Sequence, residues 1–293
     1  MKTRNVYIVG GARIPFMKSM TAYRDVSSEE LMTASLKSLV DRYNLEGKTV
    51  GDVALGAVMH SSANWNLARE VVQSSGLHPN TPAYNVQRAC GTSLENTIQI
   101  AHKISSHQIE SGIAGGVDSN SDLPIMVSRT FARKLIALNS ARTLGEKVKI
   151  ILGIKPSDLK PVLPAVVEPR TGKSMGEHCE LMVKEWNISR QEQDELALAS
   201  HRNAAQAYKD GFYDDLVFPF QGNKTDGILR ADTTLEKLSK LKPVFDKSEK
   251  GTLTAGNSSS LTDGSSTVLL ASEEEAKKHN WPLLAKLVAS HTS

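Results

Sequence analysis

Cys90 has the sequence surroundings of a nucleophile. It follows a short expected strand at 83–86 and precedes an amphipathic segment that begins near Gly91. A sharp passage from strand to helix lifts a side chain out of a sheet. The partial positive charge and free N–H groups of a helix start also stabilise a thiolate or an oxyanion. A cysteine packed as a small buried hydrophobe is the common alternative, and the local pattern does not separate the two interpretations.

A run of small and hydroxyl residues at 254–264 is the second feature that suits ligand contact. It reads Thr-Ala-Gly-Asn-Ser-Ser-Ser-Leu-Thr-Asp-Gly. Small residues let a backbone approach a ligand or another backbone closely. A tight turn between two elements is the alternative, but the run is long for a turn. We therefore expect a ligand-binding loop here.

The remaining cysteine and the histidines give no sign of metal or disulfide chemistry. Cys179 lies in an expected helix start and has no obvious base, since we expect the neighbouring His178 to face solvent. The two cysteines have no CxxC spacing, and the eight histidines are scattered without an HExxH motif. We expect no metal site, no disulfide framework and a reducing compartment.

The segment 129–160 is basic and amphipathic. It contains eight lysines and arginines but only two acidic residues, with apolar residues interleaved. Such a segment can meet an anionic ligand or lie on a membrane surface. A solvated face over a stripe of core residues would give the same pattern.

An α/β layered fold has to position Cys90, because short apolar runs alternate with helical patterns in the first 120 residues. We expect strands at 6–9, 52–58, 83–86 and 112–117, and helices at 27–43, 67–74 and 91–106. In the helix that follows Cys90, we expect Leu94, Ile98, Ala101 and Ile104 to form the buried face.

The character of the sequence changes near residue 120. We expect 1–122 and 251–272 to form one α/β domain and 123–250 to be an inserted, mostly helical domain. Its clearest helices are 177–185 and 190–210, the latter starting with a capping box of Ser189 and Glu192. The segment 273–293, a helix and a strand at 284–289, is expected to open a further domain that is cut short.

Length and composition fit a globular chain. It has 293 residues, 40% of them hydrophobic and 23% charged, and a net charge of +3. This composition argues against disorder, and the charge is too small to indicate nucleic-acid binding. No run reaches the roughly 20 apolar residues of a membrane span, and the first apolar run is too short for a signal peptide. We expect a soluble, cytoplasmic protein.

Taken in order, these motifs resemble the thiolase family over essentially the whole chain. The opening 11–16 (Gly-Ala-Arg-Ile-Pro-Phe), the cysteine turn 89–93 (Ala-Cys-Gly-Thr-Ser) and the strand end 114–119 (Ala-Gly-Gly-Val-Asp-Ser) are similar to family motifs, with Asp118 in place of a glutamate. The similarity continues through 174–180, 189–201, Arg230, 234–243 and 251–257. The long basic segment and 164–168 look most like the β-subunit type of the fatty-acid-oxidation complex.

The resemblance implies an acyltransferase that moves acyl groups between coenzyme A and a cysteine. Cys90 matches that cysteine, Ser259 beside Gly256 matches a pantetheine contact, Met175 lines the same tunnel in relatives, and Arg230 matches a nucleotide contact. It implies no cofactor beyond the coenzyme A thioester substrate, and relatives are dimers or larger assemblies. In the β-subunit type, the basic segment supports contact with a membrane or a partner subunit.

The 293 residues depart from the family pattern in three missing motifs. An Asn- or His-Glu-Ala-Phe motif, a Gly-His-Pro motif and a Cys-x-Gly motif normally complete the active site, and none of them occurs here. We therefore expect the second half to be missing and the chain alone to show no turnover. The alternatives are a non-catalytic or split-subunit assembly module, and a ketoacyl synthase, against which the motifs at 174–180 and 230–257 argue.

Overall fold

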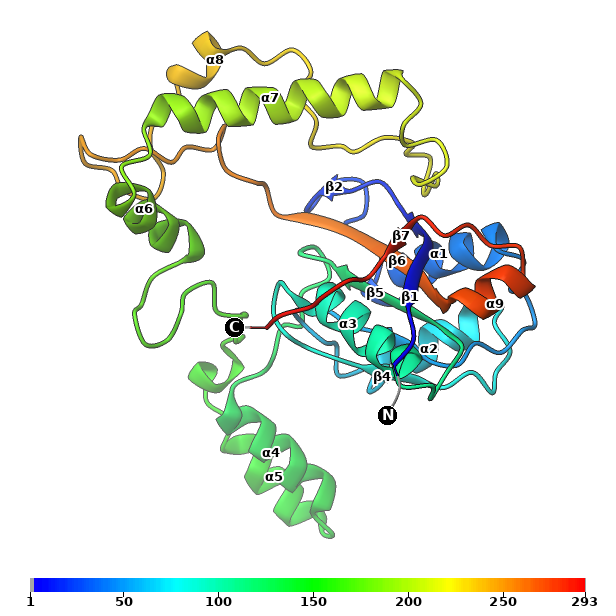
Figure 1. The fold of residues 1–293 in the computed structure, drawn as a ribbon. Helices are drawn as coiled ribbons and strands as arrows, with labels where there is room; N and C mark the ends of the chain where they lie inside the picture. The colour runs from blue at the N-terminus through cyan, green and yellow to red at the C-terminus, as the bar shows by residue number, and fades with distance from the viewer. Residues whose placement is uncertain (1–2, 293) are drawn as a thin grey trace. The chain divides into compact units, whose positions relative to one another are not determined.

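A mixed β-sheet organises the part of the chain that carries Cys90 (Figure 1). The computed structural model describes residues 3–292. The sheet order is β4-β3-β5-β6-β1-β7, with β2 paired to β6. β3 is parallel to β4 and β5, whereas β6 runs antiparallel to β5 and β1. The strands are β1 (Val6–Arg13), β2 (Met17–Lys18), β3 (Val53–Leu55), β4 (Ala83–Asn85), β5 (Ser111–Asp118), β6 (Thr262–Ser272) and β7 (Ala285–Lys286).

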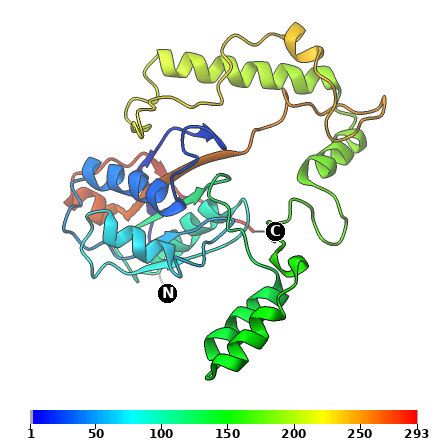
Figure 2. The same ribbon diagram turned by 180° about the vertical axis from the view of Figure 1, so that it is seen from behind.

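Helices cover both faces of this sheet. Neighbouring residues of a strand point to opposite faces, so a single strand can pack against helices on both sides. Figure 1 has α3 (Thr92–Ser105) in front of the sheet, and Figure 2 has α1 (Ser28–Arg42) and α2 (Leu67–Ser74) in front of it. Val53 and Leu55 pack with α1 and α2, whereas Ala54 packs with α3. The α/β layered fold expected from the sequence is therefore confirmed.

The buried face of α3 differs from the expected one. Leu94 is 65% exposed, while Asn96 is fully buried and donates a hydrogen bond of 2.8 Å to the Gly115 carbonyl. Asn96, Ile100 and Ile104 recur at four-residue intervals and share one helix face. Ile98, Ala101 and Ile104 are buried as predicted, whereas Leu94, in the first turn of the helix, is exposed, so the prediction of a buried Leu94 was wrong.

The return of the chain to the sheet after residue 250 is confirmed by β6, which lies between β5 and β1. The last expected strand, 284–289, is shorter than predicted, since only Ala285–Lys286 is regular. Two bonds flank it, from the Leu284 N–H to the Ile8 carbonyl (3.0 Å) and from the Leu287 N–H to the Val6 carbonyl (2.9 Å).

The described chain clusters into two compact units. Leu123–Met175 is one unit, and the residues before and after it form the other. The expected boundary after residue 122 coincides with a unit boundary, but the expected boundaries at 250 and 272 do not, because 176–250 groups with the sheet and α9 (Glu273–Lys278) packs against it. Residues 1–2 and 293 of the expected domains lie outside the described residues. The domain division stays a prediction.

The unit Leu123–Met175 is built around a helical hairpin of α4 (Arg129–Ser140) and α5 (Leu144–Leu152), followed by the 3-10 helix η1 (Pro156–Leu159). Asp158 joins these elements, because its carboxylate pairs with Lys134 and accepts from the Lys155 N–H at 2.8 Å. Neither α4 nor α5 contains a buried residue. The hairpin therefore has no core stripe of its own.

Three helices follow within the larger unit: α6 (Met175–Glu185), α7 (Arg190–Lys209) and α8 (Leu235–Ser239). The predicted capping box of α7 is present: Ser189 Oγ accepts from the Glu192 N–H, and the Glu192 carboxylate accepts from the Ser189 N–H. Buried Glu180 accepts from the Thr252 and Leu253 N–H groups, at 2.9 Å each. These bonds tie α6 to the start of the small-residue run.

None of the helices between residues 3 and 292 combines the length and the apolar character that crossing a bilayer requires.

Candidate active site

Cys90 lies on the turn between β4 and α3, as the sequence predicts, and its side chain is exposed. Thr92 holds this turn in place: its Oγ1 donates to the Ala89 carbonyl (2.7 Å) and accepts from the Arg88 N–H (2.9 Å). The Gly91 N–H donates to the Arg88 carbonyl at 3.0 Å. The structure thus favours the exposed, helix-start geometry over a cysteine packed in the core.

Strained backbone adjoins the cysteine. Ala89 has a φ of 42°, in the left-handed region that residues with a Cβ seldom adopt. Such a conformation costs about 1–3 kcal/mol and persists only where the surroundings hold it, often at functional sites. The Thr92 hydrogen bonds supply that restraint, and Cys90 is exposed on this bend.

The start of α3 leaves hydrogen-bond donors beside the sulfur. Gly91 is the N-cap and has no side chain that can accept from the first-turn N–H groups. Donors of this kind stabilise the negative charge that develops on a carbonyl oxygen during acyl transfer. The local geometry is therefore suited to a thiolate and to a tetrahedral oxyanion.

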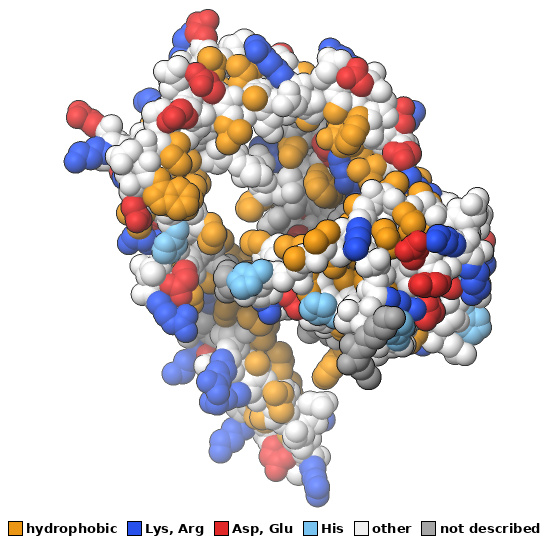
Figure 3. All heavy atoms as spheres, viewed as in Figure 1, with side chains coloured by type: hydrophobic (Ala, Val, Ile, Leu, Met, Phe, Trp, Pro, Cys, Tyr) orange, Lys and Arg blue, Asp and Glu red, His pale blue; other side chains and the backbone are white. Residues whose placement is uncertain are grey.

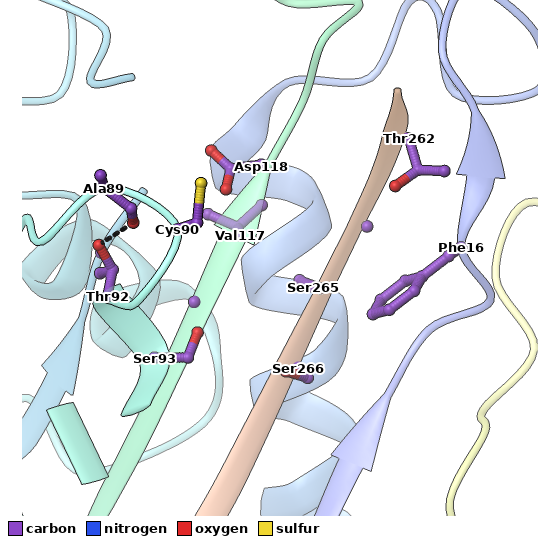
Figure 4. Close-up of a pocket in the computed structure, with 13 residues that line it drawn as sticks. Phe16, Ala89, Cys90, Thr92, Ser93, Val117, Asp118, Thr262, Ser265 and Ser266 are labelled. Atoms are coloured by element: carbon purple, nitrogen blue, oxygen red, sulfur yellow. Dashed lines mark hydrogen bonds between the residues drawn. The ribbon is translucent and has the colours of Figure 1, made fainter. Parts of the chain in front are cut away.

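Cys90 borders a hollow of about 210 Å³. Figure 4 shows the cysteine turn on one side, the ends of β5 and β6 between, and Phe16 on the other side. The lining residues are Phe16, Gly56, Ala89, Cys90, Thr92, Ser93, Gly116, Val117, Asp118, Thr262, Gly264, Ser265 and Ser266. Most of these side chains are small, so a substrate has room to reach the sulfur.

Asp118 is the acidic residue in this lining. Its Oδ1 accepts from the Val58 N–H at 2.9 Å. Burial raises the pKa of the Asp118 carboxyl, and the backbone hydrogen bond from Val58 and the nearby His60 only partly oppose that effect. A buried carboxyl with a raised pKa binds its proton more tightly than an exposed one.

A second hollow, of about 520 Å³, brings together three residues that the sequence predicts to contact coenzyme A. Arg230, Gly256 and Ser259 all line it. The fourth, Met175, is 77% exposed at the start of α6 and belongs to the unit Leu123–Met175. Its contribution to ligand binding stays a prediction.

The small-residue run borders both hollows. Residues 255–260 line the second hollow, whereas Thr262 and Gly264 line the hollow of Cys90. Asn257 holds the run against α7, because its Nδ2 donates to Asp194 Oδ1 at 2.9 Å. The prediction of a loop placed for ligand contact fits this position better than a simple turn does.

Three lining residues received no role from the sequence. Phe16 ends the Arg-x-Pro-Phe motif, and Asp118 replaces the glutamate of a family motif, so both carried a signal without a stated function. His201 lines the second hollow, and its Nδ1 accepts from the Arg230 N–H at 3.3 Å. In the sequence, only its place in the family-like stretch 189–201 drew attention to His201.

Comparison with known proteins agrees with these positions. The family model "Thiolase, N-terminal domain" matches residues 6–274. The chain belongs to the thiolase family. It is 42% identical over 278 residues to a 3-ketoacyl-CoA thiolase of Pectobacterium carotovorum, covering 93% of this chain and 63% of that protein. It is 43% identical over 284 residues to a 3-ketoacyl-CoA thiolase of Shewanella baltica, covering 94% and 64%.

Solved thiolase structures have the same fold. Human mitochondrial 3-ketoacyl-CoA thiolase in complex with CoA superposes with a TM-score of 0.79 at 28% identity, covering 97% of this chain and 68% of that one. The Bacillus anthracis acetyl-CoA acetyltransferase gives a TM-score of 0.79 at 30% identity, covering 97% and 70%. This thiolase-family chain spans 63–64% of the length of the curated relatives named above.

Proposed function

We propose that this chain is the acyl-accepting part of a thiolase-type acyltransferase, with Cys90 as the nucleophile. The observation that carries the proposal is an exposed cysteine at a restrained helix start, facing a hollow of small side chains. In the proposed step, the Cys90 thiolate attacks the thioester carbonyl of an acyl-CoA. A new C–S bond forms, the C–S bond to coenzyme A breaks, and coenzyme A leaves as a thiolate. One thioester replaces another, so little free energy is lost.

The second hollow is the proposed site for coenzyme A. The Arg230 guanidinium suits a phosphate-bearing nucleotide, and the backbone from Gly256 to Ser259 can approach the pantetheine closely. We propose the same ligand contact for Met175. The proposed substrate is a 3-ketoacyl-CoA if the enzyme works in the direction of thiolysis, and acetyl-CoA if it works in the direction of condensation.

The second half of the reaction needs groups that this sequence does not supply. Deprotonating an attacking acyl group or coenzyme A requires a base, and the Gly-His-Pro and Cys-x-Gly motifs do not occur in the 293 residues. We therefore expect acylation of Cys90 without steady-state turnover by this chain alone. The alternative, a non-catalytic or split-subunit assembly module, predicts no acylation at all.

Mass spectrometry of the purified chain after incubation with acetyl-CoA tests the proposal. We expect one acetyl group on Cys90, none in Cys90→Ala, and unchanged labelling in the control Cys179→Ala, which removes the only other cysteine. Arg230→Ala should raise the acetyl-CoA concentration that is needed by about tenfold, the usual effect of one lost charged hydrogen bond. Labelling that persists in Cys90→Ala, or its absence in the unchanged chain, would refute the proposal.

The partner proposals come from the same resemblance. We propose that the chain forms a homo-oligomer or binds a partner subunit, and that 129–160 makes peripheral contact with a membrane. The hairpin supports the latter, because it exposes Ile136 (68%), Leu144 (78%) and Leu152 (80%) among its basic residues. Cytoplasmic location stays a prediction from the sequence.

A further inference from the structure

Phe16 is the largest side chain that borders the hollow of Cys90. Apart from Val117, its neighbours in that lining are small or polar. The ring lies against β6, where a Cβ placed on Gly264 would come within 2.2 Å of the Phe16 Cδ1. Gly264 therefore leaves the space that the ring occupies, and Phe16 bounds the hollow opposite the cysteine turn (Figure 4).

A partly buried ion pair holds the backbone of Phe16. Asp226 accepts two hydrogen bonds from the Arg13 guanidinium, at 2.7 and 2.9 Å, and a third from the Phe16 N–H at 2.7 Å. The Gly227 N–H donates to the Phe16 carbonyl at 2.9 Å. Both polar groups of the Phe16 backbone are thus bonded to one short segment, 226–227, which lies 210 residues further along the chain.

The ion pair also touches the ring. The Arg13 guanidinium carbon lies 4.9 Å from the centroid of Phe16 and 5.4 Å from that of Tyr213. The side chains of Arg13 and Asp226 are only 14% and 18% exposed. Although burial alone would raise it, the hydrogen bonds from Arg13 and Phe16 hold the pKa of the Asp226 carboxyl below its ordinary value. The pair is therefore charged at neutral pH and is rigidly bonded on both sides.

We propose that Phe16 is the wall that limits the length of the acyl group on Cys90, and that the Arg13–Asp226 pair is the positioning device for this wall. The proposal rests on the proposed function, in which Cys90 carries the acyl group. A short acyl chain fits the hollow between the cysteine turn and the ring. A longer chain meets the ring face and is disfavoured.

The test uses alkyl methanethiosulfonates, which need neither coenzyme A nor a catalytic base. The Cys90 thiolate attacks the sulfenyl sulfur, a disulfide forms and methanesulfinate leaves. We would measure the rate constants for the methyl and the hexyl reagent by mass spectrometry, in a Cys179→Ala background that leaves Cys90 as the only thiol. The quantity of interest is the ratio of the hexyl rate to the methyl rate.

Phe16→Ala should raise this ratio by at least about fourfold, the effect of giving one further methylene an apolar place. Phe16→Leu should give an intermediate ratio. Asp226→Asn keeps the shape of the residue but removes the charge that holds Arg13, so it should raise the ratio by less than Phe16→Ala does. An unchanged or lower ratio in Phe16→Ala would overturn the assignment of the wall.

Asp215→Asn is the matched control. Asp215 forms a comparable ion pair, with Arg42 of α1 at 2.7 Å, but this pair does not involve Phe16. It should leave the ratio unchanged, and an equal rise in both variants would refute a positioning role for Asp226.

The same variants are then acylated with acetyl-CoA and hexanoyl-CoA. A shifted reagent ratio without any acylation would refute the proposed function alone, whereas acylation with an unshifted ratio would refute the wall alone.

Discussion

At the scale of single residues, the candidate site combines an exposed cysteine with a half-buried acid. Cys90 is exposed, whereas Asp118 in the same lining is half-buried and accepts from the Val58 N–H. A proton on Asp118 removes a negative charge from the vicinity of a thiolate. The shorter aspartate in place of a glutamate thus has an energetic consequence that can be measured.

Replacing Asp118 by Asn should stabilise the fold at pH 7 more than at acidic pH. The folded-state pKa of Asp118 is raised above its ordinary value of 3.8, so the folded chain binds this proton more tightly than the unfolded chain does. Its stabilising effect is present below the unfolded pKa and is lost as pH rises through the folded pKa. Asn retains an oxygen for the Val58 N–H and carries no charge at either pH.

Urea unfolding of both proteins, at pH 7 and near pH 4, measures the effect as the difference in unfolding free energy. The difference between variant and parent should be larger at pH 7, and equal differences at the two pH values would contradict the prediction. Asp25→Asn is the control, since that side chain is 83% exposed. It should show little change between the two conditions.

At the scale of elements, close packing of backbone sets the position of the cysteine turn. A Cβ on Gly56 would lie 2.0 Å from the Val86 carbonyl oxygen and 2.6 Å from the Thr92 Cγ2. Val86 and Thr92 flank the turn, so the absence of a side chain at Gly56 lets both ends of the turn approach β3. A backbone oxygen cannot move aside as the tip of a flexible side chain can.

Gly56→Ala should lower the free energy of unfolding by about 1–3 kcal/mol, as overpacking does, and should slow methanethiosulfonate labelling of Cys90 by displacing the turn. Gly145→Ala is the matched control: no atom lies within 4 Å of its added Cβ, and alanine favours a helix. Chemical denaturation and labelling rates check both variants. Parent-like labelling of Gly56→Ala would show that the turn does not depend on this contact.

The elements were easier to predict from the sequence than their arrangement. Periodicity and capping residues are local, so 67–74 was predicted with the observed bounds of α2 and Ser27 was predicted to start a helix. The turn that carries Cys90 could also be predicted, because the strand and the helix that flank it have local sequence patterns. The left-handed φ of Ala89, by contrast, depends on bonds from Thr92 within a folded turn.

The same limit applies to the walls of the site. Asp226 and Arg13 are 213 residues apart, and no local pattern pairs them. The two hollows likewise exist only after distant segments meet. Sequence reasoning therefore placed Cys90 on a strand-to-helix turn and singled out the run of small residues that borders both hollows, but it assigned no role to Phe16 or Asp118 in the lining.

At the scale of the whole molecule, the hairpin α4–α5 combines basic and apolar side chains on its surface. Figure 3 shows lysines and arginines gathered beside hydrophobic side chains in this part of the chain. Because neither helix contains a buried residue, the alternative of a solvated face over a core stripe does not fit this hairpin. An interfacial role is the proposal that remains.

The hairpin should bind vesicles that contain anionic lipid, and added salt should weaken the binding, because each lysine or arginine near the surface contributes about 1 kcal/mol. Leu152→Glu should reduce the bound fraction in a cosedimentation assay, since it places a charge where apolar contact is expected. Met20→Glu, at another side chain that is mostly exposed (67%), is the control and should bind like the parent. Binding that is equal to neutral and anionic vesicles would contradict the proposal.

The position of β6 also governs when the protein can fold during its synthesis. In the described sheet, β5 and β1 are joined only through β6, which is made after some 140 further residues have followed β5. Until the codons for Thr262–Ser272 are translated, the nascent polypeptide carries two open sheet edges on the ribosome. Contacts so distant in sequence form slowly, and unpaired edges invite aggregation, so the growing chain is most exposed to aggregation during that interval.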